Sequence, residues 1–246
     1  MATRNSHVNA YRKSKDLKFL NENNEFVLPD EFPDYGSAAY WNARYREEQT
    51  DSYDWLQPWE TIKPIVLPRL YDNTDAEILV VGCGNSLLST ELYKEGYHNI
   101  TNIDISDVVI TEMAKRFSVC DEMEFTVMDA TELEYPEECF DCVIDKGTMD
   151  SLLCSKDSFF RVSQMVQQIY RTLKPGGVYM MVSHGHPETR IGYLKLKDLV
   201  WTIEHASVAK IPLEEFKNVD ESNCHYVYLC TKNFNPKGGI ENRPQQ

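Results

Sequence analysis

The sequence predicts an α/β fold in which a mostly parallel β-sheet carries helices on both faces. From Glu77 onward, short apolar runs typical of buried strands alternate with longer amphipathic segments typical of helices. Glycine and proline mark the boundaries, as at residues 82–84 and 175–177. The length of 246 residues, of which 42% are hydrophobic, suits a single domain with a sizeable core. Because strand–helix–strand connections are right-handed crossovers, successive strands are expected to run parallel.

The segment before this core divides into two parts of different composition. The first is polar and rich in Asn and Glu, so it cannot form a core and is expected to be a mobile arm. Residues 37–71 hold three of the four tryptophans and predict short helices interrupted by Pro58 and Pro64. The expected organisation is an arm at 1–36, one domain at 37–232 with its α/β core at 77–232, and a frayed tail at 233–246.

Seven short segments have the composition of strands. Residues 78–81 form an uninterrupted apolar run closed by Gly82 and Gly84, which suits a strand buried on both faces. The last two segments have no convincing helix between them, so they are expected to pair antiparallel at one edge of the sheet. The expected strands are residues 78–81, 99–105, 123–128, 140–144, 178–182, 201–208 and 225–231.

Three helices are expected between these strands. One follows the glycine turn, has an apolar side made of leucines and ends at Gly96. The second spans 107–117, and the third spans 159–173, where apolar residues recur at helical spacing. The expected N-caps are Asn85 or Ser86 for the first helix and Ser106 or Asp107 for the second.

The charge balance limits the classes of partner. The chain has 25 basic and 39 acidic residues and a net charge of −14 at pH 7, which disfavours binding to a phosphate backbone. A basic protein surface or a small molecule suits this field better. The apolar runs are too short to span a membrane, and no secretory signal is recognisable. The cytosol is the expected location, with the nucleus as the alternative.

The cysteines and histidines give no metal or redox signature. Seven cysteines in a chain without a signal are expected to be reduced thiols. Cys139 and Cys142 have CxxC spacing, but they lead into a β-branched run, whereas a reactive thiolate is favoured at a helix N-terminus. No metal site is expected, since no second pair at ligand spacing accompanies His184 with His186 or Cys224 with His225.

Three strand ends carry the residues of a candidate nucleoside site, because ligands of open α/β sheets bind beyond the carboxyl ends of the strands. Gly82 and Gly84 allow close backbone approach, Asp104 can accept hydrogen bonds from ribose hydroxyls, and Asp129 with Ala130 can meet adenine. The alternatives are a tight structural turn for the glycines, a surface residue for Asp104 and a turn-forming residue for Asp129.

The third glycine position of the dinucleotide fingerprint distinguishes between nucleoside cofactors. The dinucleotide fingerprint GxGxxG, counted from Gly82, places Leu87 where pyrophosphate binding and helix packing require Gly or Ala. NAD and FAD are therefore disfavoured. S-adenosylmethionine has a ribose and an adenine, but a carboxylate in place of the pyrophosphate, so a GxG turn followed by a bulky residue suits it.

Several motifs together resemble the class I methyltransferases, and within them the elongation factor 1-alpha lysine methyltransferases of the methyltransferase-like group. The resemblance covers about residues 38 to 183 and rests on YWNARY, YDWLQPW, VGCGNS, NIDIS, MDA, FDCVIDKGTMDSLL and LKPGG. It implies a Rossmann-like, seven-stranded, mostly parallel sheet with a final antiparallel strand, and S-adenosylmethionine as the cofactor.

The resemblance also implies roles for individual residues. Aromatic faces attract a sulfonium and a lysine neutralises a carboxylate, which supports several of these roles. Otherwise the aromatic residues would be packing anchors and the lysine a solvated turn residue. The implied contacts are Gly82 and Gly84 with the methionine moiety, Asp104 with the ribose and Ile105 beside it, Asp129 and Ala130 with the adenine, Trp41, Tyr45 and Trp55 over the cofactor, and Lys146 with its carboxylate end.

The acceptor is predicted to be a lysine of a basic protein, and the resemblance together with the charge of −14 points to elongation factor 1-alpha. Such a lysine must lose a proton before methylation. Asp145 and Asp150 flank the turn after the fourth strand and are candidate catalytic residues that orient the amine. Their alternative role is local turn formation and helix capping. The alternative functions are a small-molecule methyltransferase, a cofactor-binding scaffold without turnover, and an NAD-dependent dehydrogenase, which Leu87 disfavours.

Overall fold

A computed structural model describes residues 33–47, 52–70, 72–210 and 223–234. The described residues from Tyr35 onward belong to one compact unit, which contains every helix and strand that is described. The arm expected at 1–36 lies almost entirely outside the described residues, and so do most of the tail and much of the connection between the last two strands.

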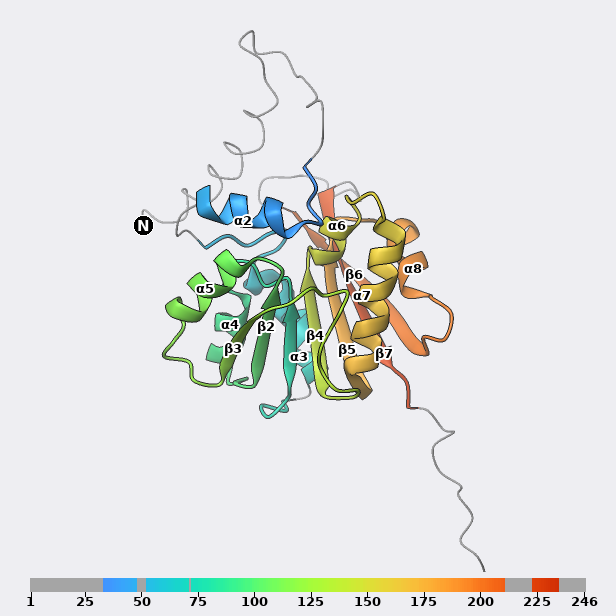
Figure 1. Cartoon of the computed structure of the whole chain (residues 1–246). Helices are drawn as coiled ribbons and strands as arrows, with labels where there is room; N and C mark the ends of the chain where they lie inside the picture. Colours follow the sequence, from blue (N-terminus) through green and yellow to red (C-terminus); the bar gives the residue numbers. More distant parts are fainter. Residues whose placement is uncertain (1–32, 48–51, 71, 211–222, 235–246) are drawn as a thin grey trace, which may run out of the picture. The chain divides into compact units, whose positions relative to one another are not determined.

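Seven strands form one sheet in the order β3-β2-β1-β4-β5-β7-β6 (Figure 1). The first five run parallel, whereas β7 runs antiparallel to both β5 and β6. The predicted mostly parallel sheet with an antiparallel pair at one edge is therefore confirmed. The strands are β1 (Ile78–Val81), β2 (Ile100–Asp104), β3 (Met123–Val127), β4 (Phe140–Lys146), β5 (Leu173–Ser183), β6 (Trp201–Ala209) and β7 (Cys224–Lys232).

Helices cover both faces of the sheet, as the sequence predicts. Buried residues of α3, α4 and α5 pack on one face, and those of α6, α7 and α8 pack on the other. Figure 1 shows α2 crossing the end of the sheet from which α6 emerges. The helices are α2 (Ala38–Glu47), α3 (Trp59–Leu70), α4 (Leu88–Lys94), α5 (Asp107–Arg116), α6 (Thr148–Leu152), α7 (Ser158–Thr172) and α8 (Pro187–Leu194).

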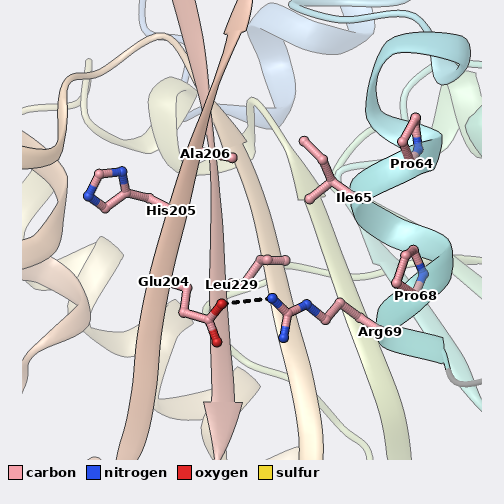
Figure 2. A pocket seen from close by; sticks show the side chains of 8 residues that line it. All are labelled: Pro64, Ile65, Pro68, Arg69, Glu204, His205, Ala206 and Leu229. Carbon is pink, nitrogen blue, oxygen red and sulfur yellow. Dashed lines mark hydrogen bonds and ion pairs between the residues drawn. The ribbon is translucent and has the colours of Figure 1, made fainter.

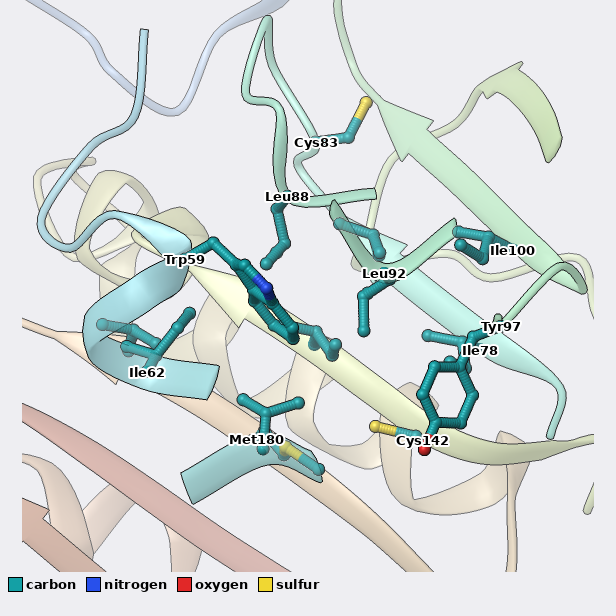
Figure 3. Packing of buried hydrophobic residues seen from close by; sticks show 14 of the residues in the cluster. Trp59, Ile62, Ile78, Cys83, Leu88, Leu92, Tyr97, Ile100, Cys142 and Met180 are labelled. Carbon is teal, nitrogen blue, oxygen red and sulfur yellow. The ribbon is translucent and has the colours of Figure 1, made fainter. Parts of the chain in front are cut away.

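Strand β1 lies between two apolar clusters, and this position explains why its residues are all apolar. Ile78 and Val80 belong to the apolar cluster on one face, whereas Leu79 and Val81 belong to the cluster on the other. Successive side chains of a strand point to opposite faces, so a strand covered by helices on both sides needs an uninterrupted apolar run. Figure 3 shows the first of these clusters, in which Trp59 of α3 packs among residues from the sheet and from α4.

The helix boundaries agree with the sequence in part. Helix α5 begins after Ser106, whose hydroxyl accepts the N–H of Val109, so the predicted cap is confirmed. Helix α4 begins at Leu88 without a side-chain cap on its N-cap residue, Leu87. The hydroxyl of Ser86 instead accepts the N–H of Leu88 at 3.1 Å, two residues further along.

Two predicted boundaries are wrong. Helix α3 starts directly after Pro58, as expected, but continues through Pro64 and Pro68. A proline inside a helix removes one N–H donor, and the burial of an apolar face compensates for that loss here. Strand β5 begins at Leu173 and not after the glycines at 176–177, because Leu173 pairs with Phe140 across an irregular register. The short helices α6 and α8 were not predicted.

Candidate functional site

The carboxyl ends of β1 and β2 are joined through the carboxylate of Asp104. One of its oxygens accepts the backbone N–H of Gly84 at 2.9 Å, and the other accepts the N–H of Ser106 at 2.9 Å. Asp104 is buried, and burial raises the pKa of its carboxyl to about 6, although both N–H donors act in the opposite direction. The structure thus brings together the glycine turn and the acidic residue that the sequence paired, and Ile105 lies half-buried beside them.

Both glycines of the turn adopt conformations that favour glycine. Gly82 has φ +60° and Gly84 has φ +52°. A Cβ on Gly82 would lie 2.0 Å from the hydroxyl oxygen of Thr148, and one on Gly84 would lie 2.8 Å from the hydroxyl oxygen of Tyr45. The turn is therefore tightly packed by side chains from α6 and α2, and its backbone can be approached closely only because no Cβ is present.

Three aromatic side chains that the sequence singled out lie together, and we call Trp41, Tyr45 and Trp55 the aromatic cover. Trp41 stacks on Tyr45 with ring centroids 5.7 Å apart and meets Trp55 edge-on at 6.4 Å. The guanidinium of Arg44 lies 4.8 Å from the Trp55 centroid and 5.7 Å from that of Trp41. The faces of this cluster therefore already attract a cation, and in this structure the cation belongs to the chain itself.

Helix α2, which carries most of the aromatic cover, and the residues just before it are tied to the rest of the domain by polar contacts. The hydroxyl of Ser106 donates to the side-chain oxygen of Asn42 at 2.6 Å. Arg161 of α7 donates to the carbonyl oxygen of Gly36 at 2.6 Å and to Asp129 at 3.1 Å. Sequence reasoning missed Arg161, because an arginine within an amphipathic helix gives no signal of a distant partner.

Asp129 and Ala130 follow β3 at the same end of the sheet. One oxygen of Asp129 accepts the N–H and the hydroxyl of Thr131, both at 2.8 Å, and the other pairs with Arg161. The first pattern is the turn role that the sequence left open as the alternative for Asp129. Ala130 is buried at 8% exposure, so its contribution to a ligand would come from its backbone.

Lys146, at the end of β4, is not a solvated turn residue. Its side chain is 6% exposed, and its ammonium lies 3.0 Å from the carboxylate of Asp54 and 3.0 Å from the carbonyl oxygen of Trp55. Asp54 also accepts the hydroxyl of Ser86. Burial lowers the pKa of Lys146, and Asp54 opposes that shift. Asp54 lies within the YDWLQPW motif, but sequence reasoning did not assign it a role.

Asp145 has partners that favour its alternative role in capping. Its carboxylate accepts the N–H of Thr148 at 2.7 Å, the N–H of Met149 at 3.2 Å and the hydroxyl of Tyr179 at 2.9 Å. The residue is completely buried, and burial raises the pKa of its carboxyl to about 7. It therefore closes the first turn of α6, and its carboxylate has no exposed edge with which to meet an acceptor.

Asp150 is the centre of a second buried network at the ends of β4 and β5. One oxygen accepts the hydroxyl of Ser183 at 2.6 Å and pairs with Arg190 at 2.9 Å. The other accepts the backbone N–H of His184 at 2.9 Å and lies 2.7 Å from that residue's Nδ1. Burial raises the pKa of Asp150, but these hydrogen bonds outweigh it, so the pKa is lowered. Sequence reasoning left His184 outside the site and missed Arg190.

A separate groove lies between α3 and the strands β6 and β7 (Figure 2). The 2.7 Å ion pair between Arg69 and Glu204 crosses this groove. The groove shares no residue with the aromatic cover or with the polar networks at the strand ends. Among the described residues, no group of three His, Cys, Asp or Glu side chains is arranged to hold a metal ion. No described helix combines the length and the apolar character needed to cross a membrane. The cluster at the strand ends, where the residues predicted from the sequence meet, is the candidate functional site.

Comparison with protein families gives a match over most of the chain. Residues 72–233 match the family described as "Methyltransferase domain". The mouse protein "EEF1A lysine methyltransferase 4" is 30% identical over 194 residues, which are 74% of this chain and 75% of the relative. The mouse "eEF1A lysine and N-terminal methyltransferase" is 37% identical over 164 residues, but the match covers only 23% of that longer protein.

Solved structures agree with the fold. The N-methyltransferase NodS of Bradyrhizobium japonicum, in complex with S-adenosyl-L-homocysteine, superimposes with a TM-score of 0.58 at 16% identity and covers 78% of this chain and 97% of NodS. A methyltransferase from Methanosarcina mazei, described as SAM-dependent, has a TM-score of 0.52 at 21% identity, covering 69% of this chain and 98% of its own. At such identities the likeness concerns the fold alone.

Proposed function

This chain belongs to the methyltransferase domain family and is an S-adenosylmethionine-dependent methyltransferase, and from that premise we propose that it methylates a lysine side chain of a protein such as elongation factor 1-alpha. The observation that carries the proposal is the 30% identity to a eukaryotic elongation factor 1-alpha lysine methyltransferase over three quarters of both chains. The net charge of −14 supports a basic protein partner, since opposite charges favour encounter.

We assign the cofactor to the strand-end cluster, because its residues fit the chemistry of the molecule. The turn without Cβ atoms suits close contact with the methionine moiety, and Asp104 has the acceptor oxygens that ribose hydroxyls require. Lys146 is the buried cation for a carboxylate, and the aromatic cover already holds a cation over its faces. The residues that would hold the cofactor are Trp41, Tyr45, Trp55, Gly82, Gly84, Asp104, Ile105, Asp129, Ala130 and Lys146.

When bound, S-adenosylmethionine supplies an electrophilic methyl group on a sulfonium. The contribution of the chain is then to place an unprotonated amine in line with that methyl group, and alignment of reactants can supply about 7–11 kcal/mol. A lysine side chain has a pKa near 10.4 in water, so the site must also favour its neutral form. Burial beside aromatic rings favours the neutral amine.

The test is methyl transfer to a purified acceptor. The chain is incubated with isotope-labelled S-adenosylmethionine and elongation factor 1-alpha, and the labelled residue is identified by mass spectrometry. We expect label on one lysine, and none with Asp104→Ala. Label on an N-terminal amine alone, or transfer only to a small thiol or phenol, would contradict the lysine assignment. The second outcome would favour a small-molecule methyltransferase.

We also propose that the protein acts in a reducing compartment, for which the cytosol is the simplest assignment. All seven cysteines lie in the described part of the chain and none of them forms a disulfide bond. Disulfides form and persist in oxidising compartments, so seven cysteines without a disulfide support a reducing one. Fluorescence microscopy of the tagged chain tests the location, and a signal confined to the secretory pathway would contradict it.

A further inference from the structure

A buried carboxylate and an exposed imidazole form a pair next to the candidate site. Nδ1 of His184 lies 2.7 Å from Oδ2 of Asp150, and the side chain of His184 is 56% exposed whereas that of Asp150 is 9% exposed. Ser183 and Arg190 occupy the other carboxylate oxygen of Asp150, and the hydroxyl of Tyr228 donates to the carbonyl oxygen of Gly185 at 2.7 Å. The loop that carries His184 is therefore fixed on both sides of the imidazole.

This arrangement determines which ring nitrogen of His184 can accept a proton. The pKa of Asp150 is lowered, so its carboxylate is ionised at neutral pH and can only accept hydrogen bonds. Nδ1 must then carry a hydrogen, which leaves the lone pair of a neutral ring on Nε2. No described residue forms a hydrogen bond with Nε2. The free lone pair is thus on the ring nitrogen that does not face Asp150, in a side chain that is 56% exposed.

The pair lies at the end of the sheet where the cofactor residues lie. Lys146 is opposite Val182 in the register of β4 and β5, and the N–H of Gly147 donates to the carbonyl oxygen of Val182 at 3.1 Å. His184 follows two residues later, directly after the last residue of β5. Ligands of open α/β sheets bind beyond these strand ends, so an acceptor that reaches the cofactor must bind at the same end of the sheet as His184.

We propose that His184 is the catalytic base that deprotonates the acceptor lysine, with Asp150 as the residue that positions it. The proposal rests on the proposed lysine acceptor. In this step an N–H bond of the lysine ammonium breaks, its electron pair stays on the lysine nitrogen, and the proton moves to Nε2 of His184. The lysine becomes a neutral amine and the imidazole becomes an imidazolium, which returns the proton to water through its exposed side. Proton transfer of this kind typically contributes 10²–10⁴-fold, which suits a lysine that is almost fully protonated at neutral pH.

The charged and titratable groups around His184 come from three elements. Asp150 on α6 is its ion-pair partner, and Arg190 on α8 pairs with the other oxygen of the same carboxylate. His225 on β7 interacts with His184 electrostatically, and burial lowers the pKa of His225 to about 4, with smaller contributions from Lys210 and His184. His225 therefore stays neutral at physiological pH, and the carboxylate of Asp150 is the dominant charge at the ring of His184.

The tautomer can be measured without any turnover. Nitrogen-15 chemical shifts of the His184 ring in the whole chain, recorded above pH 8, distinguish a protonated Nδ1 from a protonated Nε2. We expect hydrogen on Nδ1. Hydrogen on Nε2 would overturn the assignment, because that nitrogen could not then accept a proton.

The kinetic test compares His184→Gln with His186→Gln, a matched change two residues along the same loop. His186 is 38% exposed and caps α8, and it has no role in the proposed step. We expect His184→Gln to lower kcat about 100-fold at pH 7, with little change in the KM for S-adenosylmethionine, and His186→Gln to keep most of the activity. The deficit of His184→Gln should shrink toward pH 10, where solvent deprotonates lysine unaided. An equal deficit at every pH would indicate a structural role and would overturn the proposal.

Chemical rescue gives an independent outcome. Imidazole added to His184→Gly should restore part of the lost rate, whereas imidazole added to His186→Gly should have no effect. A rate for His184→Gly that does not respond to imidazole contradicts the base assignment. If the unmodified chain labels a lysine and His184→Gln matches it, only the base assignment fails. If the unmodified chain labels no lysine at all, the proposed function fails and the base assignment fails with it.

Discussion

The backbone N–H of Gly84 donates to the carboxylate of Asp104 across 2.9 Å, joining two motifs that are twenty residues apart in the sequence. The bond uses one acceptor position of Asp104 and leaves the carboxylate at the junction of β1 and β2, where it is buried at 7% exposure. Burial disfavours the charged form of the carboxylate, and the N–H donors compensate for this only in part. The pKa of Asp104 is therefore raised to about 6. The charge of Asp104 therefore changes within a pH range that binding experiments can cover.

The affinity for S-adenosylmethionine should depend on the ionisation of Asp104. Only the carboxylate can accept from both ribose hydroxyls, so binding should favour the ionised form. With a pKa of about 6, the carboxyl is mostly protonated at pH 5 and mostly ionised at pH 7. We expect the Kd measured by calorimetry to fall about tenfold between these values and then to level off.

The control is Asp104→Asn, which keeps the shape but does not titrate. Its Kd should be higher than that of the unmodified chain at pH 7 and should not vary between pH 5 and 7. A variant with the same pH dependence as the unmodified chain would show that another group titrates, and would remove Asp104 from the proposed ribose contact.

Alanine substitutions in the glycine turn should rank by the contacts that a Cβ would make. Gly82→Ala meets Thr148 at 2.0 Å and Gly84→Ala meets the hydroxyl of Tyr45 at 2.8 Å, and both have positive φ. Positive φ costs roughly 1–2 kcal/mol for an L residue, and overpacking adds about 1–3 kcal/mol. We expect Gly82→Ala to lower the free energy of unfolding more than Gly84→Ala, because Thr148 holds the start of α6 whereas the end of Tyr45 can shift.

Gly192→Ala is the matched control for these variants. Gly192 lies inside α8, and a Cβ there would meet nothing within 4 Å. Alanine should therefore stabilise the fold by about 0.5–1 kcal/mol, as for an open helical glycine. Urea denaturation of the three variants gives the ranking. If Gly84→Ala were more destabilising than Gly82→Ala, packing would not be the determining factor in the turn.

The sheet could be predicted from the sequence because its strands are buried on both faces, which requires apolar runs such as Ile78–Val81. Helix α6 could not, since its five residues are too few to show helical periodicity. Helix α8 has only eight residues and begins with a proline after an extended histidine, which is typical of a turn as well as of a helix start. The continuation of α3 through Pro64 depends on burial against the sheet, which local sequence does not reveal.

The residues of the candidate site that lie at strand ends could be predicted from the sequence, because the topology of a parallel sheet brings those ends together. Its side-chain partners were not predictable. Lys146 and Asp54 are 92 positions apart, and Arg190 and Asp150 are 40 apart, so no local pattern links them. His184 follows a strand like many solvated loop residues, and only the position of the buried carboxylate beside it distinguishes it from them.

The free energy of unfolding should depend on pH because the carboxyl of Asp145 is buried. Its pKa is raised to about 7 in the folded chain from an ordinary value of 3.8, so the folded state binds the proton more tightly. The stabilisation by the protonated carboxyl is therefore complete below about pH 4 and is lost as the pH rises toward 7. At 1.36 kcal/mol per pKa unit, the total loss is at most about 4 kcal/mol. The free energy of unfolding of the unmodified chain, relative to Asp145→Asn, should decrease between pH 4.5 and 7.5. A constant difference would show that Asp145 titrates normally.

The ion pair of Lys146 with Asp54 allows a test of whether Lys146 binds the carboxylate of the cofactor or only that of Asp54. Lys146→Met should weaken S-adenosylmethionine binding by about 10- to 100-fold if its ammonium meets the cofactor's carboxylate, as a charge-assisted hydrogen bond is worth roughly 1.5–3 kcal/mol. Asp54→Asn should then strengthen binding, because it removes the carboxylate that now lies 3.0 Å from the ammonium. Glu60→Gln, on the exposed side of α3, should leave the Kd unchanged. Weaker binding by Asp54→Asn would instead show that the pair acts by holding the segment of Trp55, whose carbonyl oxygen also accepts from Lys146 at 3.0 Å.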